Sequence, residues 1–212
     1  MRSRNPFTHT IPDRVGYDQV RQQILNGDIL LYRGRSLASR VIRWATGSAY
    51  SHAGMAVWWN ERLMVLEAVS KGVVVTPLSA NVRGYQGDVE WFTSIDEIGP
   101  EDRKRLVEIA QRELGKEYAT WRAIWLGIRV LFGRTREKRD ALRRERKLFC
   151  SLYVAAVYNA IGKDLNREVS DRFTSPADIA RSPLLRRVAA LNRRAMRVRW
   201  PSRATEIRSD GL

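Results

Sequence analysis

Cys150 is the residue best suited to nucleophilic chemistry, and it is the only cysteine among 212 residues. The small and apolar residues from Ser151 to Asn159 favour a buried helix, which places Cys150 at or just before the first turn. Unpaired backbone N–H groups and the positive end of the helix dipole stabilise a thiolate at such a position. A lone cysteine is also a common inert core residue, so position alone leaves a reactive and a structural role open.

His52 and Glu67 are candidate partners of this thiol. Residues 52–59 and 62–69 are β-like runs separated by two residues, so the sequence predicts a hairpin with a two-residue loop. In that register Gly54 lies opposite Glu67. Because side chains alternate along a strand, Glu67 becomes the diagonal neighbour of His52, within side-chain reach. A general base and the group that orients it could therefore lie side by side.

Other segments predict the elements that must hold these residues in place. Ser175, Pro176 and Asp178 form the pattern of a helix capping box. An apolar stripe over 121–131 favours a helix packed on the core, with a membrane-surface helix as the alternative. The remaining predictions are short helices over 17–25 and 36–47, strands over 28–32, 73–76 and 89–92, a chain break over 84–87, a helix from 100 to 115, and helical spacing over 184–198.

Length and composition favour one domain. A single cysteine excludes an intramolecular disulfide, and with only two histidines the chain is not expected to hold a structural zinc ion or another cofactor. The N-terminal residues lack the apolar core of a secretory signal, and no window approaches the ~18 apolar residues of a membrane span. The expectation is a protein without a transmembrane segment that is cytoplasmic as synthesised.

The formal charge of +15 is concentrated in two segments. Residues 134–147 carry eight basic and three acidic side chains, net +5, and residues 181–212 carry nine arginines and two acids, net +7. Since 15 − 12 leaves +3, the rest of the chain is nearly neutral. Such basic segments favour an anionic partner: nucleic acid, anionic lipid, an acidic protein surface or a cell-wall polymer. A merely solubilising surface is the alternative.

Taken together, the sequence resembles the NlpC-type papain-like cysteine hydrolases. In ordinary members the cysteine phrase precedes a Gly-Asp strand and the histidine phrase, whereas here the order is rotated. That rotation is the mark of the circularly permuted branch, which includes the YiiX-like amidases and, more distantly, the lecithin retinol acyltransferase group. The resemblance covers residues 16–182. The phrases that carry it are Gly27-Asp28-Ile29, Ser51-His52-Ala53-Gly54, Leu114-Gly115-Lys116-Glu117-Tyr118, Phe149-Cys150-Ser151 and Ser175-Pro176-Ala177-Asp178-Ile179.

The resemblance implies an α+β fold in which an antiparallel sheet packs against a helix bearing the nucleophilic cysteine. It implies an N-terminal arm over 1–15, a permuted papain-like hydrolase domain over 16–182 with a basic insertion over 134–147, and a basic C-terminal tail over 183–212.

The resemblance also implies roles for four residues. Cys150 would be the nucleophile, His52 the general base and Glu67 the group that orients the imidazole, while Tyr118 would line the substrate cleft. These residue types fit thiol hydrolysis, in which imidazole takes the thiol proton, thiolate attacks a carbonyl, and water hydrolyses the acyl-enzyme. Leu152 departs from the family pattern, because many relatives carry an acidic residue there; altered substrate contacts and a lapsed enzyme are both compatible with it.

Three functions follow as expectations. The first is a cysteine hydrolase that cleaves an amide bond, as in a peptidoglycan peptide, through a thioester acyl-enzyme. The second is a lipid acyl hydrolase or acyltransferase, which the permuted order allows. The third is a structural or adaptor component of a phage tail or secretion assembly. A cell-wall substrate without a secretory signal would require delivery by such an assembly.

Overall fold

The computed structural model describes residues 13–36, 39, 48–69, 72–115, 149–166 and 174–192, and the statements below concern these residues. Their strands are β1 (Arg14–Gly16), β2 (Ile29–Gly34), β3 (His52–Trp59), β4 (Arg62–Val69), β5 (Gly72–Pro77), β6 (Gly87–Ser94) and β7 (Leu185–Asn192). Their helices are α1 (Tyr17–Val20), a 3-10 turn (Arg21–Gln23), α3 (Leu78–Gly84), α4 (Pro100–Arg112), α7 (Phe149–Asn159) and α8 (Pro176–Arg181).

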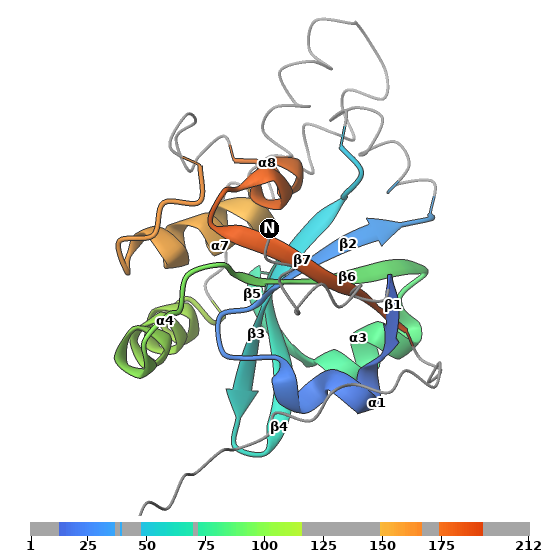
Figure 1. Cartoon of the computed structure of the whole chain (residues 1–212), viewed down its shortest axis with the longest axis horizontal. Helices are drawn as coiled ribbons and strands as arrows, with labels where there is room; N and C mark the ends of the chain where they lie inside the picture. The colour runs from blue at the N-terminus through green and yellow to red at the C-terminus, as the bar shows by residue number, and fades with distance from the viewer. Residues whose placement is uncertain are drawn as a thin grey trace, which may run out of the picture.

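The seven strands form one twisted sheet in the order β1-β7-β6-β2-β3-β4-β5 (Figure 1). Neighbouring strands are antiparallel except β1 and β7, which are parallel. Helix α7 packs against β3 and β4. The predicted α+β class, with a largely antiparallel sheet against the cysteine helix, is confirmed.

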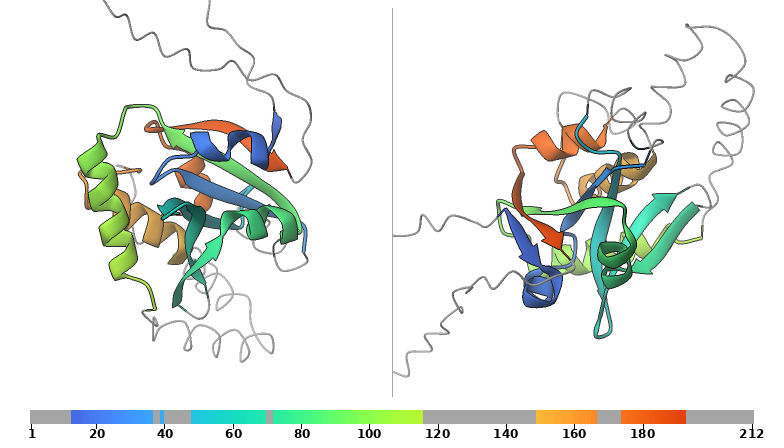
Figure 2. Two further views of the ribbon diagram at one scale, coloured as in Figure 1. Left: turned by 90° about the horizontal axis from the view of Figure 1, so that it is seen from below. Right: turned by 90° about the vertical axis from the view of Figure 1, so that its right-hand side faces the viewer.

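Helices cover both faces of this sheet, as the perpendicular views show (Figure 2). Strand alternation divides the apolar residues between the faces. Ile29 and Leu31 of β2 point into a core shared with α4, α7 and α8, whereas Leu30 and Tyr32 point into a second core shared with α1 and α3. Both faces are buried, which explains why β2 reads as a continuous apolar run.

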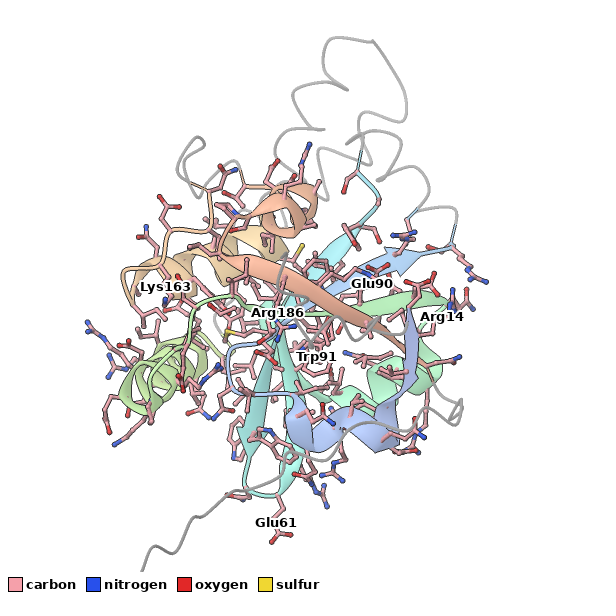
Figure 3. All side chains as sticks on the ribbon, viewed as in Figure 1. Arg14, Glu61, Glu90, Trp91, Lys163 and Arg186 are labelled. Carbon is pink, nitrogen blue, oxygen red and sulfur yellow. The ribbon has the colours of Figure 1, made fainter. Side chains whose placement is uncertain are left out.

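The β3–β4 hairpin forms with the predicted bounds and loop. Trp59 lies opposite Arg62, and the two loop residues are Asn60, at a φ of 52°, and Glu61. Glu61 marks the tip of the hairpin, far from the opposite end of the strands (Figure 3). The predicted register is therefore confirmed, and it fixes which face of the sheet each hairpin side chain occupies.

The element type predicted for residues 184–198 was wrong. Residues 185–192 form strand β7 between β1 and β6, so the helical spacing over 184–198 was misleading and the sheet extends past the predicted boundary at 182. The contiguous apolar run 188–191 is what a strand buried on both faces requires. Arg14 and Val15 of the predicted N-terminal arm belong to β1. The break predicted over 84–87 is present, because α3 ends at Gly84 and β6 begins at Gly87.

Other predicted features lie outside the described residues: most of the helix over 36–47, the apolar stripe over 121–131, the basic insertion 134–147 and the tail beyond residue 192. No helix in the described part of the chain has the length and apolar character needed to cross a bilayer.

Asp28 ties the start of β2 to its neighbours. Its buried carboxylate accepts hydrogen bonds from Trp91 Nε1 at 2.7 Å, Thr93 Oγ1 at 2.8 Å and the backbone N–H of Leu25 at 3.0 Å. Burial raises the pKa of this carboxyl, and the three donors act in the opposite direction. The aspartate of the Gly-Asp phrase is thus a structural acceptor that joins β2 to β6.

Candidate active site

Cys150 is the second residue of α7, as the sequence predicted, and its side chain is half-buried. Two buried hydroxyls anchor the helix below it. Tyr153 donates to the carbonyl of Ala110 in α4 at 3.0 Å, and Tyr158 donates to the carbonyl of Gly27 at 2.6 Å. These bonds fix the helix against α4 and the start of β2, and so fix the position of the thiol.

His52 is the first residue of β3, and its Nε2 lies 2.6 Å from Oε2 of Glu67 in β4. This contact is the one that the hairpin register predicted. The residue between them on this face is Gly54, where a Cβ atom would come within 2.7 Å of Val65 Cγ2 and 3.5 Å of Glu67 Cβ. A larger side chain at this position would therefore collide with Val65.

Cys150 and His52 interact directly, although they come from opposite sides of the sheet. Burial alone would raise the pKa of the Cys150 thiol, but the charge and hydrogen bond of His52, together with the backbone N–H groups of Ala53 and Ser151, lower it. Burial would likewise lower the pKa of His52, but the sulfur of Cys150 and the carboxylate of Glu67 raise it. Both shifts favour a thiolate–imidazolium pair.

Glu67 is itself held by neighbours that the sequence had not revealed. Its second oxygen, Oε1, accepts a hydrogen bond from Thr76 Oγ1 at 3.1 Å and from Asn81 Nδ2 at 3.2 Å. Burial raises the pKa of Glu67, but His52, Asn81 and Thr76 outweigh it, so the net shift is downward. The ring of Tyr32 lies against His52, with 5.2 Å between ring centroids.

The arrangement can perform thiol-based acyl transfer. Since Nε2 of His52 is bonded to Glu67, Nδ1 is the ring nitrogen left for the sulfur. The imidazole can take the thiol proton and later deliver it to a leaving group, while the carboxylate holds the ring in the required tautomer. Of the four predicted site residues, the structure brings Cys150, His52 and Glu67 together, whereas Tyr118 lies outside the described residues. Leu152 is half-buried in α7.

Cys150, His52 and Glu67, each in contact with the next, form the nucleophile, base and orienting carboxylate of a cysteine hydrolase. Residues 23–122 match the family of permuted papain-like amidases described as YaeF/YiiX, C92 family. The resemblance to the YiiX-like branch is thereby confirmed, and the family's character supports the predicted class of cysteine hydrolase. The matched range contains His52 and Glu67 and ends before Cys150.

Two proteins similar to this chain bear the same name. The uncharacterized protein YiiX of Escherichia coli K12 is 37% identical over 93 residues, which are 43% of this chain and 46% of that protein. This chain thus spans about half the length of that curated relative. The crystal structure of YiiX from E. coli O157:H7 superposes with a TM-score of 0.58 and 26% identity, covering 80% of this chain and 99% of that chain.

The YiiX crystal structure is described as that of a metalloprotein. The described residues of the present chain include no group of three or more His, Cys, Asp or Glu side chains placed to hold a metal ion. At the site itself, Nε2 of His52 is bonded to Glu67 and the ring also bonds Cys150, so these residues are arranged as partners of one another. These three residues do not fit a metal centre.

Proposed function

We propose that this protein is a cysteine hydrolase that cleaves an amide bond in a peptidoglycan peptide through a thioester acyl-enzyme. The observation that supports this best is the contact of His52 with both Glu67 and Cys150 at the start of α7. An amide is a poor leaving group, so its cleavage needs both a strong nucleophile and a proton donor. The thiolate and the imidazolium of this pair supply these two functions.

The reaction begins with attack of the Cys150 thiolate on the amide carbonyl. The backbone N–H of Cys150, near the start of α7, is a suitable donor to the oxyanion that forms. The imidazolium of His52 then protonates the departing amine and leaves a thioester. The neutral imidazole takes a proton from water, whose oxygen attacks the thioester, and release of the carboxylate product restores the pair.

The substrate is part of the proposal, and it rests on the resemblance and on the basic charge of the chain. Peptidoglycan peptides are the usual substrates of the superfamily that the sequence resembles, and a net charge of +15 favours anionic cell-wall polymers. The protein would reach such a substrate from the cytoplasm through a virion or secretion assembly.

The test is digestion of purified peptidoglycan and, separately, of phospholipid vesicles, followed by mass spectrometry. We expect new amine and carboxyl termini in the peptide stems, and no such products with Cys150→Ala. Release of fatty acid from the vesicles instead would replace the amidase by a lipid acyl hydrolase. If neither peptidoglycan nor phospholipid is cleaved and Cys150 does not react with iodoacetamide, the structural or adaptor role is favoured.

A further inference from the structure

Among the described residues, Glu67 is the hydrogen-bond partner of Nε2 of His52, so whatever fixes Glu67 also helps to fix the imidazole. The carboxylate sits on β4, next to β5, and is opposite Val74 in the sheet. Its two oxygens have separate partners: Oε2 faces the imidazole, and Oε1 faces Thr76 and Asn81. A carboxylate bound at both oxygens cannot rotate about its terminal bond without losing hydrogen bonds.

The two donors come from different elements. Thr76 lies near the end of β5, and Asn81 lies in the middle of the seven-residue helix α3, which packs against β4 and β5 and is anchored by fully buried Leu78. Asn81 Nδ2 also lies 3.3 Å from Thr76 Oγ1 and 3.1 Å from the hydroxyl of Tyr32. With two amide hydrogens, it joins Glu67 to the tyrosine whose ring lies against His52.

We propose that Thr76 and Asn81 are positioning residues of this active site, which hold the Glu67 carboxylate in the orientation that keeps His52 protonated and aimed at Cys150. The inference rests on the proposed function, because it assigns a role within that site. Both residues act through Glu67, to whose Oε1 they donate. The hydroxyl and the amide donate to Oε1, which leaves Oε2 free to accept from the imidazolium.

The same contacts distinguish this role from simple packing. Thr93 makes a matching interaction elsewhere in the sheet, where its hydroxyl donates to the buried carboxylate of Asp28 at 2.8 Å. Thr93 and Thr76 therefore both satisfy a carboxylate, but only the carboxylate beside Thr76 contacts His52. Thr93→Val is thus a matched control for Thr76→Val.

The experiment measures the rate of Cys150 alkylation by iodoacetamide as a function of pH. Because the chain has a single cysteine, all label reports on this thiol, and no substrate has to be known. Loss of one hydrogen bond to a charged group should lower the alkylation rate at pH 6 by roughly ten-fold in Thr76→Val and in Asn81→Leu. The pH below which alkylation slows should rise, because the Cys150 thiolate is protonated at a higher pH when the imidazolium beside it is less stable.

Two variants separate positioning from folding. Thr76→Ser keeps the hydroxyl and should return the profile to that of the wild type, whereas Thr93→Val should lower the Tm without moving the profile. A Thr76→Val or Asn81→Leu profile identical to the wild type, or one extended to lower pH, would overturn the positioning role while the proposed function stands. A wild-type profile like that of an ordinary thiol would instead overturn the proposed function itself.

Discussion

Replacement of Glu67 by glutamine should be more damaging than replacement by alanine, although glutamine has nearly the same shape. In the wild type, Oε1 faces two donors, Thr76 Oγ1 and Asn81 Nδ2. The amide introduced by Glu67→Gln will turn its oxygen toward them and its NH2 group toward His52. The imidazole must then accept at Nε2, which forces its proton onto Nδ1, the nitrogen that should receive the proton of Cys150.

The magnitudes follow from these contacts. Glu67→Ala removes one charge-assisted bond of 2.6 Å, worth roughly 1.5–3 kcal/mol, and should lower kcat/KM by roughly 10- to 150-fold. Glu67→Gln also places an NH2 donor against Nε2, which destabilises the imidazolium and favours the neutral tautomer with its proton on Nδ1. In serine proteases a comparable carboxylate-to-amide change costs about 10⁴ in kcat. We expect the glutamine variant to be at least about ten-fold slower than the alanine variant.

The assay combines turnover of peptidoglycan fragments with ¹⁵N NMR of the histidine rings. The chain has only His9 and His52, so a His9→Gln background leaves a single pair of ring nitrogens. In the wild type both nitrogens should carry protons at pH 7, because the pKa of His52 is raised by Cys150 and Glu67 against the effect of burial. Glu67→Gln should show one protonated nitrogen, Nδ1. Equal or higher activity of Glu67→Gln than of Glu67→Ala would refute the orientation inferred for the Glu67 carboxylate between His52 and its donors Thr76 and Asn81.

Three further predictions concern the thiol, the fold and the chain end. Iodoacetamide should label Cys150 well below pH ~8.5, and His52→Ala should move labelling to that ordinary range, because the thiolate loses its positive partner. The same pH dependence of labelling in wild type and His52→Ala would contradict the ion pair. Asp28→Ala leaves three donors unpaired and should lower the unfolding free energy by roughly 3–5 kcal/mol in urea titrations, without moving the labelling profile. Deletion of 183–212 removes β7 and should unfold the protein. Deletion of 193–212 removes six arginines and two acids; it should leave the Tm unchanged and weaken binding to a polyanion. Binding of the full chain that does not fall with added salt would exclude this electrostatic role.

The contact between His52 and Glu67 could be predicted because it depends on local rules alone. A two-residue loop sets the strand pairing, and the alternation of side chains sets the face. The capping box at Ser175 was predictable for the same reason: Ser175 accepts from the backbone N–H of Asp178, and the Asp178 carboxylate accepts from that of Ser175.

Strand β7 could not be recognised in the same way. Its apolar residues Leu185, Val188 and Leu191 recur every three residues, which favours a helix when the sequence is considered alone. Pairing decides the matter, because β7 fills the space between β1 and β6, and Ala189 and Ala190 are buried on its two faces. The partners of this strand lie about 100 residues or more before it in the chain, beyond the reach of any local pattern.

The site itself combines both kinds of information. The base and its carboxylate belong to one hairpin, so the strand register that brings His52 and Glu67 together is set locally. The thiol reaches them only because α7 is anchored through Tyr153 and Tyr158 to α4 and the start of β2. Glu67 depends in turn on α3 through Asn81. The sequence can therefore indicate which groups react, whereas the packing of α3 and α7 on opposite faces determines whether the groups meet in a reactive state.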